Sequence, residues 1–296
     1  MTDNSVKTEY AVALGFFDGL HRAHRAVLEG ALTIAREQGL KPAVLLFDQH
    51  PRTVITGDAV PALLQKKRRN EMLEGMGLTL FFVSFKDIKD MSPREFFEEI
   101  LIKKFRAGAL SCGYNYNFGK RAQGNTEALR ELCEERGLSL RVCPEFTLGG
   151  STVSSTEIRK ALENGEIEAA NEMLGFSFGF KAEVFTGDQR GRLLGAPTIN
   201  QYIPEELIVP KFGVYASRVY FDGREYTGVT NIGARPTFGK GSVRSETYIV
   251  GFSGDLYGRE VEIELKSFIR GEKKFPDADT LKAQIEEDVK AAMRRS

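Results

Sequence analysis

An excess of either charge is missing from this sequence of 296 residues, in which 41 Lys and Arg residues balance 41 Asp and Glu residues. A chain without net charge exerts no long-range attraction on nucleic acid or on an anionic membrane, although a local basic pocket can still bind a phosphate group. No stretch approaches the roughly 18 continuous apolar residues of a membrane span, and the N-terminal MTDNSVKTEY is too polar for a signal peptide. We therefore expect a cytosolic protein that binds neither nucleic acid nor membrane.

Cysteine is scarce, and its pattern excludes the usual zinc sets. Cys112, Cys133 and Cys143 are odd in number, show no CxxC spacing and have no neighbouring histidine. We expect three buried, reduced thiols. The sequence also lacks an internal repeat, a low-complexity linker and the phosphate-binding motif GxxxxGK[ST], so any nucleotide site must be built in another way.

The length favours two domains, and the first half alternates short apolar runs with helical patterns. A helix with Ser92 before Pro93 at its first turn is one example. Alternation of this kind predicts a parallel sheet with crossover helices, in which ligands bind at the carboxyl ends of the strands. The predicted strands are 10–16, 42–47, 78–85, 107–113 and 138–144, and the predicted helices are 23–39, 92–105 and 125–137.

The pattern changes after about residue 175, where apolar and polar residues alternate with period two. A turn at Phe221-Asp222-Gly223 divides the longest of these runs. Strands without intervening helices predict a small antiparallel barrel or sandwich, and a helix over 277–295 ends the chain. We expect an α/β domain over 1–176 and a β domain over 177–296, the strand runs of the latter being 176–187, 213–233, 245–252 and 259–270.

All three histidines are predicted to lie at one edge of the first sheet. His21 and His24 follow a strand and the loop GFFDG at a helix start, and His50 follows the next strand. Free N–H groups at a helix N-terminus suit a phosphate, and imidazoles can donate hydrogen bonds to a developing phosphoryl charge. Two alternatives remain open: a solvated pair on a helix surface, and a zinc pair, for which a spacing of four is usual.

A second set of donors follows in VSSTEIRKAL. Ser154, Ser155 and Thr156 stand at the start of a predicted helix, with Arg159 one turn later. Hydroxyls, exposed N–H groups and a guanidinium together can bind a triphosphate. A well-capped helix is the alternative, since Ser155 or Thr156 alone supplies a cap.

The second half holds a different candidate site, in GDQRGRLLGAPTINQ. Its glycines at 187, 191 and 195 allow a close approach of the backbone to phosphate. Thr198 and Asn200 alternate on an extended segment, and their oxygens are suitable ligands for Mg²⁺. Glu246 could accept a proton from an alcohol that attacks a γ-phosphate. A plain hairpin turn and a solvated glutamate are the alternatives.

The elements ALGFFDGLHRAH, FDQHP, GYNYNFGKRAQGN and VSSTEIRKAL together resemble the N-terminal half of bacterial bifunctional riboflavin kinase/FAD synthetases. The resemblance implies a Rossmann-like nucleotidyltransferase domain that couples ATP with FMN to give FAD, without a covalent intermediate. It implies catalytic roles for His21, His24 and Arg159 and a flavin contact for Phe118. The nucleotide-binding residues it implies are Gly15, Phe17, Asp18, His50, Asn115, Ser154, Ser155 and Thr156.

The ordered set GRLLGAPTIN, NIGARPTF, ETYIVGFSGDLYG and FIRGEKKF resembles the riboflavin kinase domain of the same enzymes. It implies a six-stranded antiparallel barrel with a terminal helix, and riboflavin and ATP as substrates. Thr198 and Asn200 match the Mg²⁺–ATP residues, and Glu246 matches the base. The remaining implied contacts are Gly187, Gly191, Gly195 and Pro197 for the nucleotide and Arg235, Phe268 and Arg270 for the flavin.

The chain departs from the family pattern His-x-Gly-His by having Ala23 at the glycine position. If phosphate must approach the backbone closely there, the methyl group crowds it; if the residue is helical, alanine is favourable.

The alternatives to a bifunctional enzyme are a riboflavin kinase with an impaired adenylyltransferase half, which Ala23 leaves open, and a flavin-binding regulator. A regulator that acts on RNA would show a basic stripe or stacking aromatics, which the sequence lacks. The sequence allows a homo-oligomer.

Overall fold

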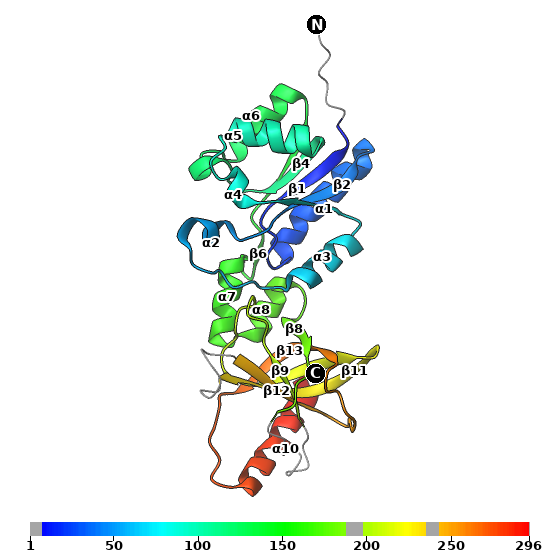
Figure 1. Cartoon of the computed structure of the whole chain (residues 1–296), viewed down its shortest axis with the longest axis vertical. Coiled ribbons are helices and arrows are strands. Elements are labelled where there is room, and N and C mark those ends of the chain that lie inside the picture. The colour runs from blue at the N-terminus through cyan, green and yellow to red at the C-terminus, as the bar shows by residue number, and fades with distance from the viewer. Residues whose placement is uncertain (1–7, 188–197, 235–242, 296) are drawn as a thin grey trace. The chain divides into compact units, whose positions relative to one another are not determined.

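The computed structural model describes residues 8–187, 198–234 and 243–295, and the chain divides into two compact units (Figure 1). The first unit comprises Met1–Pro61 and Lys66–Ser154, and the second comprises Ala62–Gln65 and Ser155–Ser296. Each unit is described by itself.

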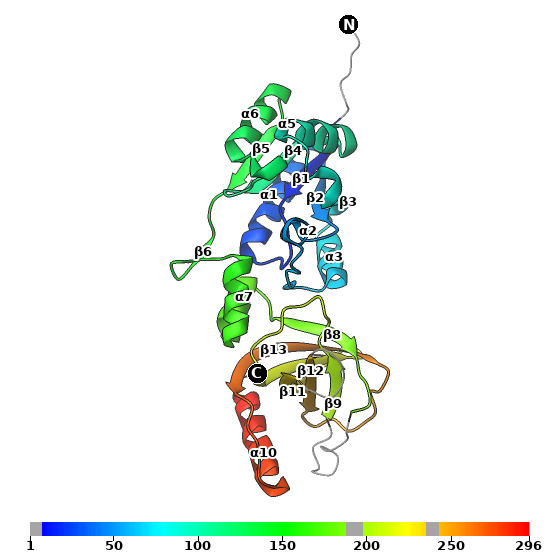
Figure 2. The same cartoon turned by 60° about the vertical axis from the view of Figure 1, so that its left-hand side comes forward.

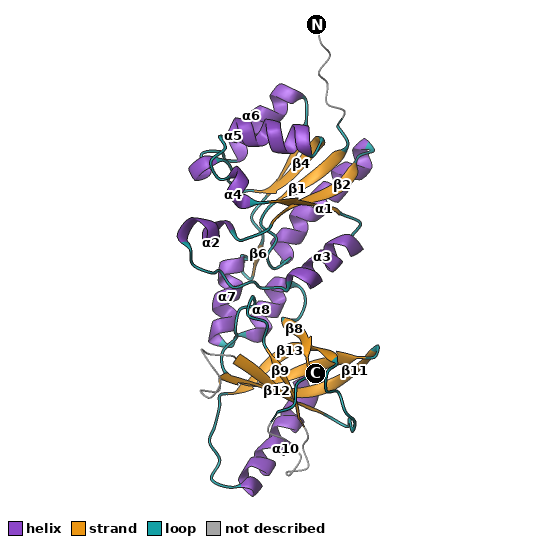
Figure 3. Ribbon diagram, viewed as in Figure 1, coloured by secondary structure: helices purple, strands orange, loops and turns teal. Residues whose placement is uncertain are grey.

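The first unit is built on a five-stranded sheet in the order β3-β2-β1-β4-β5, and Figure 3 shows its strands β4, β1 and β2 in orange. All its strand pairs are parallel, which confirms the predicted α/β architecture. The central strand β1 lies between β2 and β4, so the strand order reverses beside β1 and creates a switch point at the carboxyl ends of β1 and β4. The strands are β1 Tyr10–Leu14, β2 Lys41–Phe47, β3 Thr79–Val83, β4 Ala107–Gly113 and β5 Ser139–Cys143.

This unit has a helix at each place where the periodicity of the sequence predicts a long one. Helix α1, Arg22–Gln38, buries an apolar stripe that includes Leu28 and Ile34 and ends at Gly39, whose φ of 66° is left-handed. The other helices are α2 Pro51–Thr56, α3 Lys66–Gly75, α4 Phe85–Ile88, α5 Pro93–Glu95, the π-helix η1 Phe96–Lys104, the 3₁₀ turn η2 Lys120–Ala122 and α6 Thr126–Arg136. A short hairpin, β6 Thr147–Leu148 and β7 Ser151–Thr152, completes the unit.

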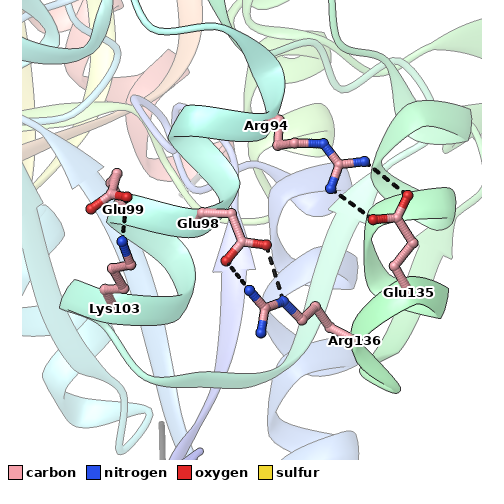
Figure 4. A network of polar contacts seen from close by, with 6 residues as sticks. All are labelled: Arg94, Glu98, Glu99, Lys103, Glu135 and Arg136. Atoms are coloured by element: carbon pink, nitrogen blue, oxygen red, sulfur yellow. Dashed lines mark hydrogen bonds and ion pairs between the residues drawn. The ribbon is translucent and has the colours of Figure 1, made fainter. Parts of the chain in front are cut away.

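The predicted helix over 92–105 is α-helical only in its first turn. A capping box between Ser92 and Glu95 starts it as predicted, but η1 continues it as a π-helix. Ion pairs attach this segment to α6 (Figure 4): Arg94 makes a bidentate contact with Glu135 at 2.7 and 2.8 Å, and Arg136 makes one with Glu98. These pairs connect α5 and η1 with α6, and because they are largely exposed their contribution to stability is small.

The second unit contains a six-stranded antiparallel sheet in the order β8-β13-β10-β11-β12-β9, and Figure 2 shows its curvature. The Phe185 N–H donates to the Asn200 carbonyl at 2.9 Å, so the chain after β8 meets the edge strand β9 and nearly closes a barrel. The predicted barrel is confirmed. Its strands are β8 Gly179–Glu183, β9 Thr198–Tyr202, β10 Gly213–Phe221, β11 Arg224–Ala234, β12 Val243–Ile249 and β13 Glu260–Arg270.

The predicted turn between β10 and β11 is confirmed in its conformation. Asp222 and Gly223 have φ of 52° and 68°, as the central residues of a two-residue type I′ hairpin require. One boundary differs from the prediction: β12 begins at Val243, before the predicted start at 245, so that Glu246 lies within the strand and not at its start. The polar residue Arg244 had hidden this part of the strand in the sequence.

The described residues of the second unit include the helices α7 Ser155–Asn164, α8 Ile167–Leu174 and α10 Ala278–Arg295. Ile158 and Leu174 join the barrel residue Phe180 in one apolar core, so α7 and α8 belong to the compact unit of the barrel. The predicted domain boundary after residue 176 follows α8, whereas the compact units separate before α7, because the helices bury their apolar faces against the barrel. The boundary of the functional domains stays a prediction.

Residues 62–65 join the second unit although they lie early in the sequence. The Ala62 N–H donates to the Glu206 carbonyl at 2.7 Å, and the Ala62 carbonyl accepts from the Ile208 N–H at 2.9 Å. Leu63 is buried in the barrel core, and Gln65 exchanges two hydrogen bonds with the Lys181 backbone. Local periodicity could not predict that residues 62–65 belong to the second unit, because their place depends on pairing with distant segments.

The three cysteines are buried and unpaired by disulfides, as the sequence predicts. Burial raises the pKa of the Cys112 thiol to about 12 and that of Cys133 to about 11. Over the ranges for which the structure is described, no helix is both long and apolar enough to cross a membrane.

Candidate active sites

The loop between β1 and α1 is tightly constrained. Phe17 and Leu20 have φ of 50° and 43°, in the left-handed region that side chains rarely adopt. The Phe17 ring is fully buried and folds back over Gly15, where an added Cβ would lie 2.9 Å from it. Asp18 is also buried. Backbone strain held in place by packing is a common feature of functional sites.

His21 is the N-cap of α1, and this role indicates which tautomer its neutral ring adopts. The ring is 4% exposed, and its Nδ1 accepts a hydrogen bond from the His24 N–H at 3.3 Å. Because Nδ1 is an acceptor, the proton of the neutral ring is on Nε2, which can donate to a ligand.

The His24 ring stacks on the His21 ring, with centroids 3.6 Å apart and planes at 16°. This geometry confirms that a spacing of three brings both imidazoles to one face.

His50 lies at the same sheet edge and plays the same capping role. It is the N-cap of α2, and its Nδ1 accepts from the Arg52 N–H at 3.1 Å. The Phe16 ring is 4.1 Å from His50, and the Phe17 ring is 5.2 Å from His24. The three histidines thus lie at one edge of the sheet, as their placement after neighbouring strands predicts, and two adjacent phenylalanines of one loop pack against His50 and His24.

The switch point also exposes Asn115, just beyond the end of β4. Its carbonyl accepts from the Asn117 side chain at 2.8 Å, which shapes the loop. Phe118 differs: it is 6% exposed and packs on Phe96 and Tyr116, with centroids 5.8 and 5.7 Å away. The structure therefore gives Phe118 a core role, and a flavin contact for it stays a prediction.

The second donor set lies at a helix start, as predicted. Ser155 begins α7, Thr156 is exposed and Arg159 is half-buried one turn later. Ser154 directly precedes the helix and is the last residue of the first unit. Ala23 lies in the first turn of α1, so the position that is glycine in the family pattern is helical in this chain.

In the second unit, a polar row crosses three strands on one face of the sheet. Glu246 on β12 lies directly opposite Asn200 on β9 and opposite Asn231 on β11. Asn200 is 5% exposed, and a Cβ at Gly187 would collide with its carboxamide. Thr198 shares the face of Asn200 because the two alternate on β9. The structure thus brings Gly187, Thr198, Asn200 and Glu246 together.

Two members of this face are absent from the sequence prediction. Arg244, two residues before Glu246 on β12, is ion-paired with it. Asn231 completes the row on β11. Arg244 could have been found in the sequence, because a strand that alternates with period two places residue 244 on the same face as Glu246. Asn231 could not, because its place opposite Glu246 depends on strand pairing, which leaves no signal in a local pattern.

The other predicted residues of this unit have structural partners or fall outside the described ranges. Phe268 packs edge-on against Tyr215, with centroids 5.3 Å apart. Arg270 binds Asp288 of α10 at 2.7 Å. A flavin contact for either residue stays a prediction. Gly191, Gly195, Pro197 and Arg235 lie outside the described residues.

Replacing Arg270 with methionine should lower the free energy of unfolding by about 3–5 kcal/mol, because the Asp288 carboxylate would remain buried without its cation. Asp288 is 3% exposed, and the guanidinium meets it through both Nε and Nη2. Urea unfolding of the ligand-free protein measures the change in the free energy of unfolding of the second unit. Lys290→Met removes an exposed pair with Glu287 on the same helix and should have little effect. Equal effects of the two variants would contradict this role.

No group of three or more His, Cys, Asp or Glu side chains in the described part of the chain could hold a metal ion. Thr198 and Asn200 nonetheless offer a hydroxyl and an amide oxygen on one face, which suits a hard cation that takes its other ligands from phosphate and water.

Comparisons with known proteins cover both units. The family profile described as FAD synthetase matches residues 3–157, and that described as riboflavin kinase matches residues 174–295. The bifunctional riboflavin kinase/FMN adenylyltransferase of Listeria monocytogenes is 34% identical over 292 residues, covering 97% of this chain and 92% of that protein. The protein of the same name from Bacillus subtilis is 34% identical over 299 residues, covering 98% and 94%.

A solved structure from Streptococcus pneumoniae, described as a macrolide-efflux protein, has a TM-score of 0.90 at 27% identity and covers 98% of this chain and 95% of that one. That description applies to the Streptococcus protein alone. The parallel α/β unit and the barrel unit thus match the two halves of a two-domain transferase. The chain belongs to the family of bifunctional riboflavin kinase/FMN adenylyltransferases.

Proposed function

We propose that this chain phosphorylates riboflavin to FMN with ATP, and that it transfers AMP from a second ATP to FMN, giving FAD and pyrophosphate. The observation that carries this proposal is the match of both family profiles to consecutive parts of one chain, each with its own constellation of polar residues. The two activities share FMN, as the product of one and the substrate of the other.

The second unit carries the kinase reaction. The ribityl 5′-oxygen forms a bond to the γ-phosphorus as the bond from that phosphorus to the bridging oxygen of ADP breaks. Glu246 accepts the hydroxyl proton. Its position opposite Asn200, in register on β12 and β9, supports this role, because the base and the nucleotide-binding amide then share one face.

Thr198 and Asn200 are the proposed ligands of Mg²⁺ in this reaction. The burial of the Asn200 carboxamide against Gly187 supports the assignment, since the backbone fixes the orientation of the amide. Bound with ATP, Mg²⁺ supplies positive charge that offsets the charge of the phosphate oxygens. Gly187, Gly191, Gly195 and Pro197 are proposed to contact the nucleotide, and Arg235, Phe268 and Arg270 to contact the flavin.

The adenylyl transfer belongs to residues 3–157, which match the FAD synthetase profile. A phosphate oxygen of FMN forms a bond to the α-phosphorus of ATP, and the bond from that phosphorus to pyrophosphate breaks. The Nε2–H of His21, directed by the N-cap contact of its Nδ1, donates to the phosphate oxygens. His24 binds beside it. Gly15, Phe17, Asp18, His50 and Asn115 are proposed to line this nucleotide site, and Phe118 to contact the flavin.

Ser154, Ser155, Thr156 and Arg159 are proposed to bind phosphate groups of ATP. Their place at the start of α7 supports the proposal, because the first N–H groups of a helix have no acceptor within the helix and suit an anion. The predicted cytosolic location, the absence of nucleic-acid binding and a homo-oligomeric state stay predictions.

Ala23→Gly should lower the stability of the first unit by about 1 kcal/mol and should not raise the rate of FAD formation, since glycine is unfavourable in a helix. The position of Ala23 inside α1 is the reason for this expectation. Thermal melting and the initial rate of FAD formation from FMN measure the two effects. A large gain in rate would instead favour a kinase with an impaired adenylyltransferase half.

The proposed function is tested by product analysis. Purified protein receives Mg²⁺–ATP with riboflavin in one sample and with FMN in another, and chromatography with fluorescence detection identifies the flavins. FMN and FAD from the first sample and FAD from the second are expected. FMN without FAD would restrict the chain to the kinase reaction, and no product from either sample would contradict an enzymatic role.

A further inference from the structure

The proposed base of the kinase reaction has a cationic neighbour that the motifs do not include. The Arg244 Nη2 atom contacts Glu246 Oε1. Both residues are on β12 and are separated by two positions, so their side chains leave the same face of the sheet. The contact joins one nitrogen to one oxygen, which leaves the second carboxylate oxygen of Glu246 for another partner.

Burial makes this contact more than a surface ion pair. The side chain of Arg244 is 13% exposed, whereas that of Glu246 is 37% exposed. A guanidinium so far removed from water requires an anionic partner. The glutamate, by contrast, keeps access to solvent, as a group that must meet a substrate does. The arginine is thus the anchored member of the pair, and the carboxylate is the accessible one.

The strands on either side fix where Arg244 lies. Tyr202 on β9 is directly opposite Arg244, and its ring stacks on Phe185 with centroids 4.2 Å apart. On β11 the opposite residue is Gly233, and the Glu272 carboxylate lies over it, so that a Cβ of residue 233 would collide with Oε1. Toward Glu246, the same two strands offer the amides of Asn200 and Asn231. The charged pair therefore lies between an aromatic end and an amide end of one face.

We propose that Arg244 is a positioning residue of the riboflavin kinase reaction, which holds the Glu246 carboxylate in the orientation that accepts the ribityl hydroxyl proton. The inference rests on the proposed role of Glu246. In this proposal Arg244 acts through Glu246 and not by contact with a substrate. Its effect is geometric: a carboxylate held at one oxygen by a buried cation has fewer orientations, and the alignment of a reacting pair contributes strongly to rate.

The expected result for Arg244→Met is a fall in kcat for FMN formation of about tenfold to 100-fold, with the KM for ATP unchanged, because misplacement of a reacting group acts on the chemical step. Arg244→Lys should recover most of the activity, since a single N–O contact does not need the planar fork of arginine. FAD formation from added FMN by the same preparations is an internal control and should not change.

A double-mutant cycle with Glu246→Gln decides whether Arg244 acts through the glutamate. If it does, Arg244→Met/Glu246→Gln is no slower than Glu246→Gln alone. Arg218→Met is the matched control, because Arg218 pairs with Glu225 at 2.9 Å on another part of the same barrel; its kcat should be unchanged.

The outcomes separate the two hypotheses. Additive losses, an unchanged kcat in Arg244→Met, or failure of lysine to rescue would overturn the positioning role. A Glu246→Gln variant with unchanged kcat would instead overturn the proposed base, whatever Arg244 does. If Arg244→Met unfolds, Arg244→Gln and Arg244→Lys, compared at equal folded fraction, provide the same test.

Discussion

FAD formation should fall about 10²- to 10³-fold when His21 is replaced by asparagine, the loss typical of removing one preorganised hydrogen-bond donor from a charged transition state. His21 is suited to this role because its Nδ1 is occupied by the His24 N–H, so that Nε2 must carry the donated proton. Asparagine can replace the N-cap contact that Nδ1 makes, but it cannot replace the hydrogen bond that Nε2–H donates to a phosphate. It is a favourable N-cap residue, yet its short side chain cannot hold the cap and reach a phosphate at once.

Comparison with His21→Ala separates the cap from the chemistry. The alanine variant should lose a further ~1 kcal/mol of stability, since it cannot cap α1, with no further loss of FAD formation. FMN formation from riboflavin should be normal in both variants, because it belongs to the second unit. The measurements are initial rates with added FMN and thermal melting. Normal FAD formation by His21→Asn would exclude His21 from catalysis and leave it as a structural cap.

Glu246→Gln should reduce FMN formation by about 10²- to 10⁴-fold, the range in which general bases contribute. Glutamine preserves the shape of the side chain and can still accept a hydrogen bond from Arg244, but it cannot take up the hydroxyl proton. The KM for ATP should change little, because Asn200 and Thr198, on the adjacent strand, are the proposed metal–nucleotide residues. Steady-state kinetics with riboflavin measure both constants.

A control for this variant is Tyr248→Phe, which alters the next outward residue of β12 without removing a carboxylate. It should retain most of the kcat. FAD formation from added FMN should be normal in both variants. A loss in Glu246→Gln that appears in KM for ATP and not in kcat would assign Glu246 to nucleotide binding and not to proton transfer.

The sequence was sufficient to predict the architecture of both units and the placement of the histidines. A strand, a glycine-flanked loop and a helix start leave few positions for His21 and His24, and their spacing of three determines the shared face. Period-two alternation and the Asp222-Gly223 turn similarly specified the hairpin of β10 and β11. In each case the determining interactions are local, so a short window of residues contains them.

Features that depend on distant pairing could not be predicted in this way. Phe118 resembles a ligand contact in its motif, but its ring packs into the core against Phe96. Arg270 pairs with Asp288, which lies on the last helix and is not a neighbour in the sequence. The docking of residues 62–65 against the barrel depends on backbone hydrogen bonds to residues 206 and 208. None of these partners is within reach of a local pattern.

The central claim is that one chain contains two separate active sites connected by FMN, and a complementation measurement tests it directly. His21→Asn and Glu246→Gln are each incubated with riboflavin and Mg²⁺–ATP, alone and mixed in equal amounts, and the FAD formed is measured. We expect FMN but almost no FAD from the first variant, almost no product from the second, and abundant FAD from the mixture. A mixture that forms no more FAD than the variants alone, although Glu246→Gln converts added FMN, would contradict two sites linked by free FMN.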